Sequence, residues 1–149
     1  ASLGFTTLAL TPNNNVLACG TESGYVSLFD LSNSNNENNN TIVNNDTEQW
    51  LLSNNDVSKT AFKELSNLTT PITELKFDPT GSILAFASNR KKDSLRLYDV
   101  QNQCVYPNFP RQSQPLHYVS KVAFAPNSGY MAVANAKGKA MLWRNNRFK

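Results

Sequence analysis

Residues 74–87 read ELKFDPTGSILAFA, and this strand–turn–strand pattern decides the fold. Leu75 and Phe77 are spaced by two, which is typical of a strand that turns one face to a core. Asp, Pro and Gly then occupy the first, second and fourth positions of a type I turn at 78–81. Aligned on its proline, the pattern recurs at 7–20 as TLALTPNNNVLACG and at 121–134 as KVAFAPNSGYMAVA. Three such copies indicate a chain built from repeated units.

A third strand follows each copy and carries an aromatic residue near its end. This residue follows the proline by seventeen positions in the outer copies, as Phe29 and Trp143, and by nineteen in the middle copy, as Tyr98. The two additional residues of the middle copy fall within 89–93, NRKKD, so the insertion is a loop. Candidate fourth strands follow the first two copies at 60–65 and 104–109, the second weakened by its proline.

Each unit therefore reads as an antiparallel sheet of up to four strands. Such units, repeated about every 40–45 residues and ending in aromatic-Asp, are typical of β-propeller blades. We predict an all-β fold that forms three C-terminal blades of a larger WD-repeat β-propeller, at 1–70, 71–117 and 118–149. A generic β-sandwich is the alternative, but a sandwich has no reason to repeat this pattern three times.

The last of these blades lacks its closing strand. Propellers protect their edge strands by closing a ring of four to eight blades. We therefore expect a segment N-terminal to this chain to supply the missing strand.

An asparagine-rich insert, at about 31–58, interrupts the first blade. Ten asparagines lie between Leu31 and Asn55, with few apolar residues among them. Such a tract cannot bury enough apolar surface to offset the entropy lost on ordering. We predict a disordered loop between the third and fourth strands of the blade.

Composition argues for a binding protein and against an enzyme. The N-terminus has no signal-peptide pattern, and no apolar run approaches the length of a membrane span. Cys19 and Cys104 are expected to be reduced and structural. The only histidine, His117, has no partners with which to form a catalytic set or a zinc site. We therefore expect no catalytic residues, no cofactor and no metal.

Charge is distributed unevenly along the chain. Residues 1–70 carry two basic and seven acidic residues, whereas residues 71–149 carry twelve basic and four acidic ones. Turns of an antiparallel meander alternate between its two ends, so the connections between second and third strands share one end. The connection from Arg111 to His117 shares that end. Five basic residues gather there and form the candidate partner-binding site: Arg90, Lys91, Lys92, Arg111 and Lys137. The alternatives are a solvated surface and a contact with an acidic partner, either RNA phosphates or an acidic protein segment.

Residues 65–149 also resemble a known family. The residues that carry the resemblance are the loop 90–93 (RKKD) followed by 95–97 (LRL), the connection from Phe109-Pro110 to Pro115-Leu116, and the run 122–132. Together they resemble the C-terminal blades of a nucleolar WD-repeat family, numbered eighteen among the proteins associated with the small nucleolar RNA of the small-subunit processome. Two features depart from the family pattern: Trp143-Arg144 replaces aromatic-Asp, and the asparagine-rich insert is foreign to it.

The resemblance implies a non-catalytic scaffold that acts in ribosome biogenesis and in the processing of the small-subunit ribosomal RNA precursor. Its implied partners are other proteins of the UTP-B subcomplex and small nucleolar or pre-ribosomal RNA within a large ribonucleoprotein assembly, with no membrane. The implied location is the nucleolus of the nucleus. The alternative is a WD-repeat adaptor of another complex, such as a ubiquitin ligase or a chromatin reader.

Overall fold

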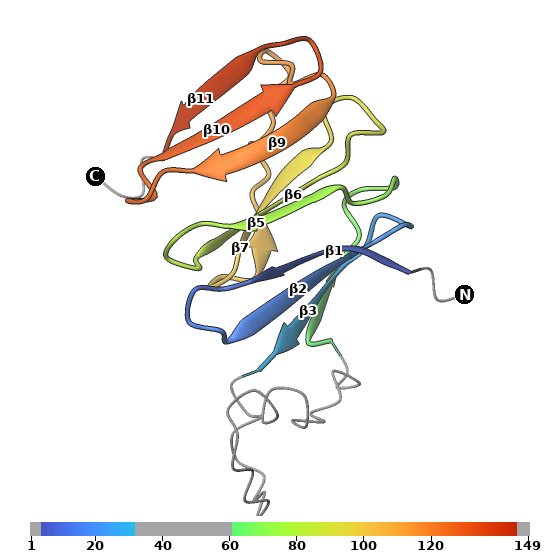
Figure 1. The fold of residues 1–149 in the computed structure, drawn as a ribbon, viewed down its shortest axis with the longest axis vertical. Helices are drawn as coiled ribbons and strands as arrows, with labels where there is room; N and C mark the ends of the chain where they lie inside the picture. Colours follow the sequence, from blue (N-terminus) through green and yellow to red (C-terminus); the bar gives the residue numbers. More distant parts are fainter. Residues whose placement is uncertain (1–3, 32–60, 146–149) are drawn as a thin grey trace, which may run out of the picture.

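The computed structural model describes residues 4–31 and 61–145, which form strands and turns without a helix (Figure 1). The strands are β1 (Phe5–Leu10), β2 (Val16–Thr21), β3 (Val26–Asp30), β4 (Lys63–Leu65), β5 (Glu74–Phe77), β6 (Ile83–Ala87), β7 (Leu95–Asp99), β8 (Cys104–Val105), β9 (Val119–Phe124), β10 (Tyr130–Asn135) and β11 (Ala140–Arg144). Each predicted first, second and third strand of a unit is present. The asparagine-rich insert at about 31–58 lies, apart from Leu31, outside the described residues.

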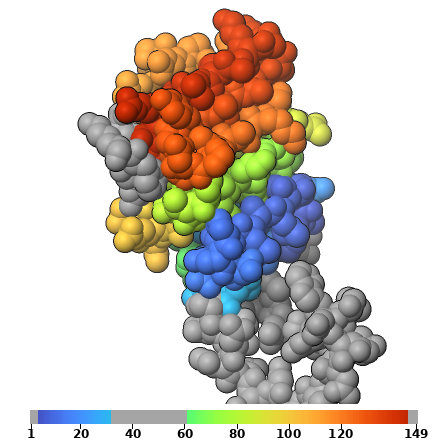
Figure 2. Space-filling view, turned by 60° about the vertical axis from the view of Figure 1, so that its left-hand side comes forward, coloured from blue at the N-terminus to red at the C-terminus, as the bar shows by residue number. Residues whose placement is uncertain are grey.

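The strands form three antiparallel sheets in chain order. The first has the order β1-β2-β3-β4, the second β5-β6-β7-β8 and the third β11-β10-β9. The first strands of successive sheets, β1, β5 and β9, lie side by side, and the sheets stack in sequence order (Figures 1 and 2). In a propeller, the first strands of consecutive blades lie next to each other and each sheet extends outward from them. The three sheets have this arrangement, so the fold is part of a WD-repeat β-propeller.

The fourth strands are shorter than the sequence pattern predicted. The strand expected at 104–109 ends at Val105, because Pro107 has no N–H to continue the ladder with β7. The strand expected at 60–65 is seen over its last three residues as β4, and Thr60 lies outside the described residues. Both still pair antiparallel with the third strand of their sheet.

Strand β6 is buried on both faces, because it lies between the first and third sheets. Leu84 and Phe86 pack into an apolar cluster shared with the first sheet. Ala85 and Ala87 point the other way, into a cluster shared with the third sheet. Side chains alternate along a strand, so one five-residue strand contributes to both interfaces between sheets.

The first strand of the first sheet differs from its counterparts in exposure. Leu8 of β1 is 62% exposed, whereas the corresponding Leu75 of β5 and Val122 of β9 are buried. Leu10 is 50% exposed, whereas its counterparts Phe77 and Phe124 are half-buried. β5 and β9 each have a preceding sheet to cover that face. Among the described residues, no sheet covers the same face of β1.

The proline turns of the three sheets lie at one end of the stack, on the left in Figure 1. In the middle sheet the Gly81 N–H donates to the Asp78 carbonyl at 2.9 Å, which closes the predicted turn. The buried Asp78 carboxylate accepts hydrogen bonds from the Ile83 N–H at 2.9 Å and the Ser128 hydroxyl at 2.8 Å. The second bond ties the turn of the second sheet to that of the third.

Candidate functional site

The connections between second and third strands lie at the opposite end, which is called the basic end below. In the first and third sheets they are the short segments 22–25 and 136–139, and in the second sheet the longer segment 88–94. Arg90, Lys91 and Lys92 are exposed in the longer segment, and Lys137 is exposed in the turn before β11. The structure therefore places these four residues at one end, as the strand alternation predicted.

Arg111 lies in the connection that joins β8 to β9. It is exposed and begins a turn closed by a hydrogen bond from the Gln114 N–H to its carbonyl at 3.0 Å. The same connection reaches the basic end at residues 116–118. Within 4–31 and 61–145, no hydrogen bond links the Arg111 side chain to the loops that carry the other four basic residues.

Asp93 fastens the long loop to the connection before β9. Its carboxylate oxygen Oδ1 accepts the N–H groups of Leu116 at 2.6 Å and His117 at 3.0 Å. Its own N–H donates to the His117 carbonyl at 2.9 Å. Asp93 and His117 both have positive φ, 57° and 60°. Aspartate tolerates this left-handed conformation better than most residues, which explains why it is suited to this position.

Arg96 supports the same loop from below. Its Nη1 donates to the carbonyl of Asp93 at 2.9 Å and to that of Leu95 at 3.0 Å. Burial lowers the pKa of the Arg96 guanidinium, and the negative charge of Asp93 opposes that shift. Arg96 is half-buried and its guanidinium donates to backbone carbonyls, so its role is structural. It is not part of the exposed cationic surface.

Asn135 holds the turn of the third sheet against the same connection. Its Oδ1 accepts the N–H groups of Lys137 at 3.0 Å and Lys139 at 3.1 Å. Its Nδ2 donates to the carbonyl of Leu116 at 3.1 Å. The Ala136 N–H adds a bond of 2.9 Å to the carbonyl of residue 118. Two loops with basic side chains are thus attached to one short segment, residues 116–118.

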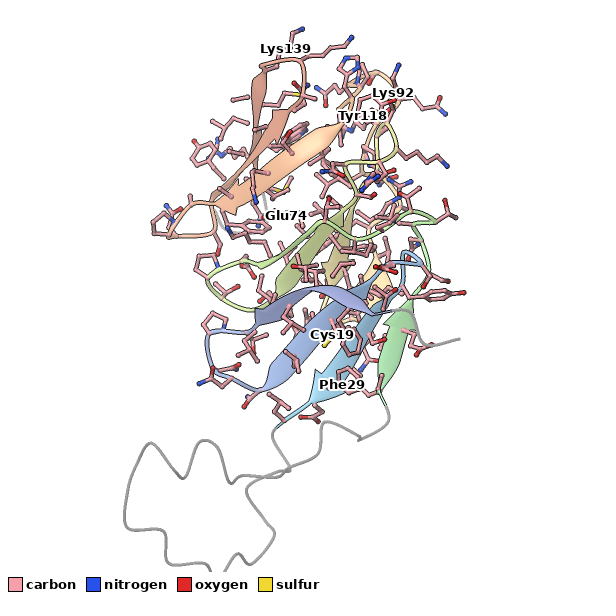
Figure 3. The ribbon with its side chains drawn as sticks, turned by 45° about the vertical axis from the view of Figure 1, so that its right-hand side comes forward. Cys19, Phe29, Glu74, Lys92, Tyr118 and Lys139 are labelled. Atoms are coloured by element: carbon pink, nitrogen blue, oxygen red, sulfur yellow. The ribbon has the colours of Figure 1, made fainter. Side chains whose placement is uncertain are left out.

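Tyr118 lies between these two loops. Tyr118 is 39% exposed, and the Lys92 ammonium lies 5.9 Å from the centroid of its ring. Figure 3 shows Lys92 and Tyr118 next to each other, with Lys139 at the same end of the third sheet. The basic end therefore combines exposed cations with an exposed aromatic ring.

The acidic residues of the second and third sheets are already engaged. The Asp93 carboxylate accepts backbone N–H groups. Glu74, buried at the start of β5, pairs with Lys121 at 3.3 Å. Asp78 lies at the opposite end, and Asp99 caps the turn after β7. No acidic side chain of the described second and third sheets is therefore available to neutralise the exposed cations of the basic end.

Sequence reasoning missed three residues of this site. Lys139 directly follows Gly138, and a second lysine in the same turn was a usable signal. Tyr118 directly precedes β9, and nothing in its neighbouring residues signals that it is exposed. Asp93 was assigned to the loop but not to its attachment, because the bonds it accepts come from residues more than twenty positions away.

No group of three or more potential metal ligands lies within 4–31 and 61–145. No helix in those ranges is long and apolar enough to cross a membrane. Both cysteines are free, Cys19 buried and Cys104 exposed. Burial raises the pKa of the Cys19 thiol.

Asp93→Ala is expected to lower the free energy of unfolding by about 2–3 kcal/mol, because it removes the acceptor of two N–H groups and places alanine at positive φ. Asp93→Asn keeps an acceptor and tolerates the conformation, so its cost should be less than half as large. Hydrogen exchange at the amides of Leu116 and His117 in the full-length protein reports the effect. Equal exchange rates in the two variants would contradict this role of Asp93.

The chain was compared with family models, curated proteins and solved structures. No family model matches it. The β-propeller domain of Cps50 (Swd1) from Myceliophteria thermophila superposes with a TM-score of 0.62 at 19% identity, over 98% of this chain and 37% of that one. At this identity the likeness concerns the fold alone, and it agrees with the propeller assignment.

Curated relatives carry one shared name. The chain is 37% identical to U3 small nucleolar RNA-associated protein 18 of Saccharomyces cerevisiae, over 91% of the chain and 20% of that protein. It is 30% identical to the homolog of Homo sapiens, over 95% of the chain and 22% of that protein. It is 32% identical to the probable U3 small nucleolar RNA-associated protein 18 of Schizosaccharomyces pombe, over 93% of the chain and 23% of that protein. The chain spans about a fifth of the length of these relatives, and it belongs to the family of U3 small nucleolar RNA-associated protein 18.

Proposed function

We propose that the protein containing this chain is a non-catalytic scaffold of the small-subunit processome, which acts in ribosome biogenesis and in processing of the small-subunit ribosomal RNA precursor. The observation that carries the proposal is the identity of 30–37% with relatives named as U3 small nucleolar RNA-associated proteins. The same kinship favours this function over an adaptor of a ubiquitin ligase or a chromatin reader. The proposed location is the nucleolus, with UTP-B proteins and U3 or pre-ribosomal RNA as partners.

The basic end, together with Arg111 of the connection before β9, is the proposed contact surface for an acidic partner. Arg90, Lys91, Lys92, Arg111 and Lys137 are all exposed, and the loop 88–94 is longer than the corresponding connections of the other two sheets. A tight turn would be enough to join the strands. The additional residues are basic and consecutive, which supports a role in binding RNA phosphates.

The third blade, proposed at 118–149, is completed by a fourth strand that pairs with the outer edge of β11. β3 pairs on its outer side with β4, whereas β11 pairs within the described residues only with β10. The outer edge of β11 therefore has no strand beside it in the described ranges. A fourth strand on β11 would protect this edge, as β4 protects that of β3.

Affinity purification of the tagged full-length protein from growing cells tests the function. We expect ribosomal RNA precursor, U3 RNA and UTP-B proteins to be recovered, as measured by RNA sequencing and mass spectrometry. A matched purification of an unrelated WD-repeat protein controls for abundant RNA. Recovery of a ubiquitin-ligase core or of histones in place of these components would contradict the proposal.

A further inference from the structure

We propose that Tyr118 and the two loops beside it form a binding site for single-stranded RNA, in which an unpaired base stacks on the Tyr118 ring while neighbouring phosphates contact Lys92 and the lysines of the turn before β11. The inference rests on the proposed function and deepens it, because it names the form of RNA and the residue that distinguishes that form.

The backbone around Tyr118 is fixed while its ring is free. Leu116 and Val119 on either side are fully buried, and the Tyr118 carbonyl accepts the Ala136 N–H at 2.9 Å. Tyr118 as a residue is 39% exposed. A ring held on a rigid segment loses little freedom when a ligand packs on it, which is the property of a stacking platform.

The two loops bonded to residues 116–118 both carry cations. Lys92 approaches it from the loop that Asp93 fastens to Leu116 and His117. In the other loop, Asn135 fixes the turn that carries Lys137 and Lys139. A strand that crosses Tyr118 from one loop to the other would meet phosphate-binding groups before and after the stacked base.

The lysine over the ring is compatible with this arrangement. At 5.9 Å from the centroid, the Lys92 ammonium makes a loose cation–π contact on a flexible stem. It can move from the ring to a phosphate when a base takes its place. The contact with the ring is then exchanged for a charge-assisted hydrogen bond.

The aromatic ring favours single-stranded RNA over a duplex or an acidic peptide. Bases in a duplex are stacked on one another and offer no free face, and the A-form major groove is too narrow for side chains. An acidic peptide would use the lysines but not the ring. An unpaired nucleotide uses both, and every base has a face that can stack.

The test measures binding of the full-length protein to a labelled, unstructured RNA of about twelve nucleotides, a length within the range of known single-strand sites. Tyr118→Ala is expected to weaken binding about tenfold, the size of one stacked base, without changing the salt dependence. Tyr118→Phe keeps the ring and should bind within about twofold of the unchanged protein. Tyr130, 43% exposed at the opposite end, supplies the matched control, and Tyr130→Ala should bind normally.

Three outcomes would overturn the inference: unchanged binding by Tyr118→Ala, an equal loss for the same RNA annealed to its complement, or an equal loss for a polyglutamate peptide. Thermal unfolding of each variant checks that Tyr118→Ala is folded, and Tyr118→Phe keeps the test valid if it is not. If stacking fails while U3 RNA and UTP-B proteins still co-purify, the proposed function stands. If Tyr118→Ala weakens RNA binding but the unchanged protein purifies without U3 RNA and UTP-B proteins, the stacking site stands and the proposed function fails.

Discussion

Replacing Arg90, Lys91 and Lys92 together by alanine is expected to weaken binding of the full-length protein to single-stranded RNA on the order of a hundredfold at about 0.1 M salt. Each phosphate contact on a single strand releases about 0.7 of a counterion, so three lost contacts should also reduce the slope of log affinity against log salt by about two. All three side chains are exposed, so the fold should be unaffected. Titrations by fluorescence anisotropy at several salt concentrations measure both quantities.

A matched triple variant removes the same charge from the strands. Lys63, Lys76 and Arg144 lie on β4, β5 and β11, outside the connections of the basic end. Their replacement by alanine should change the affinity only slightly, because long-range attraction between exposed charges is screened at this salt. Equal losses in the two triple variants would show that net charge alone binds the RNA. Unchanged RNA crosslinking and unchanged incorporation into particles in the loop variant would show that the loop is a solvated surface.

Phe86→Ala is expected to lower the free energy of unfolding by about 3–5 kcal/mol, the usual cost of removing a fully buried aromatic ring. Phe86 is 0% exposed and lies in the cluster between the first and second sheets. Ile72 and Leu75 belong to the same cluster, so the cavity would lie at the joint between two sheets. Urea unfolding of the full-length protein, followed by hydrogen exchange across β5 and β6, reports the loss.

Phe62→Ala is the matched control, since it removes the same atoms from a side chain that is 43% exposed. It should cost about 1 kcal/mol or less, because no closed cavity is formed. A similar loss in both variants would mean that the interface between the sheets is not the part of the fold that Phe86 stabilises. Faster exchange confined to β5 and β6 in Phe86→Ala would support the assignment.

The basic residues of the basic end could be predicted from the sequence, whereas the exposed Tyr118 could not. The positions of Arg90, Lys91, Lys92 and Lys137 followed from strand alternation, because an antiparallel meander returns every second turn to the same end. Tyr118 could not be assigned in this way. An aromatic residue before a strand is most often part of a core, and its exposure depends on how the third sheet packs against the second.

Corrections to the predicted strands have similar causes. The repeat located nine strands within about two residues, because alternation is a property of neighbouring positions. It overestimated the strand expected at 104–109, where the pattern continues but Pro107 removes an N–H. A pattern of side chains describes which face is buried, and it does not report whether the backbone can keep its hydrogen bonds.

The sequence by itself determined the threefold repeat, the all-β class, and the long basic loop inserted in the middle copy. All three depend on patterns among residues that lie close together along the chain. Only the tertiary structure decided that Asp93 and Asn135 fasten two basic loops to residues 116–118 and leave the Tyr118 ring exposed between them. Those hydrogen bonds join residues 19 to 24 positions apart, and whether they form depends on the packing of one sheet against the next.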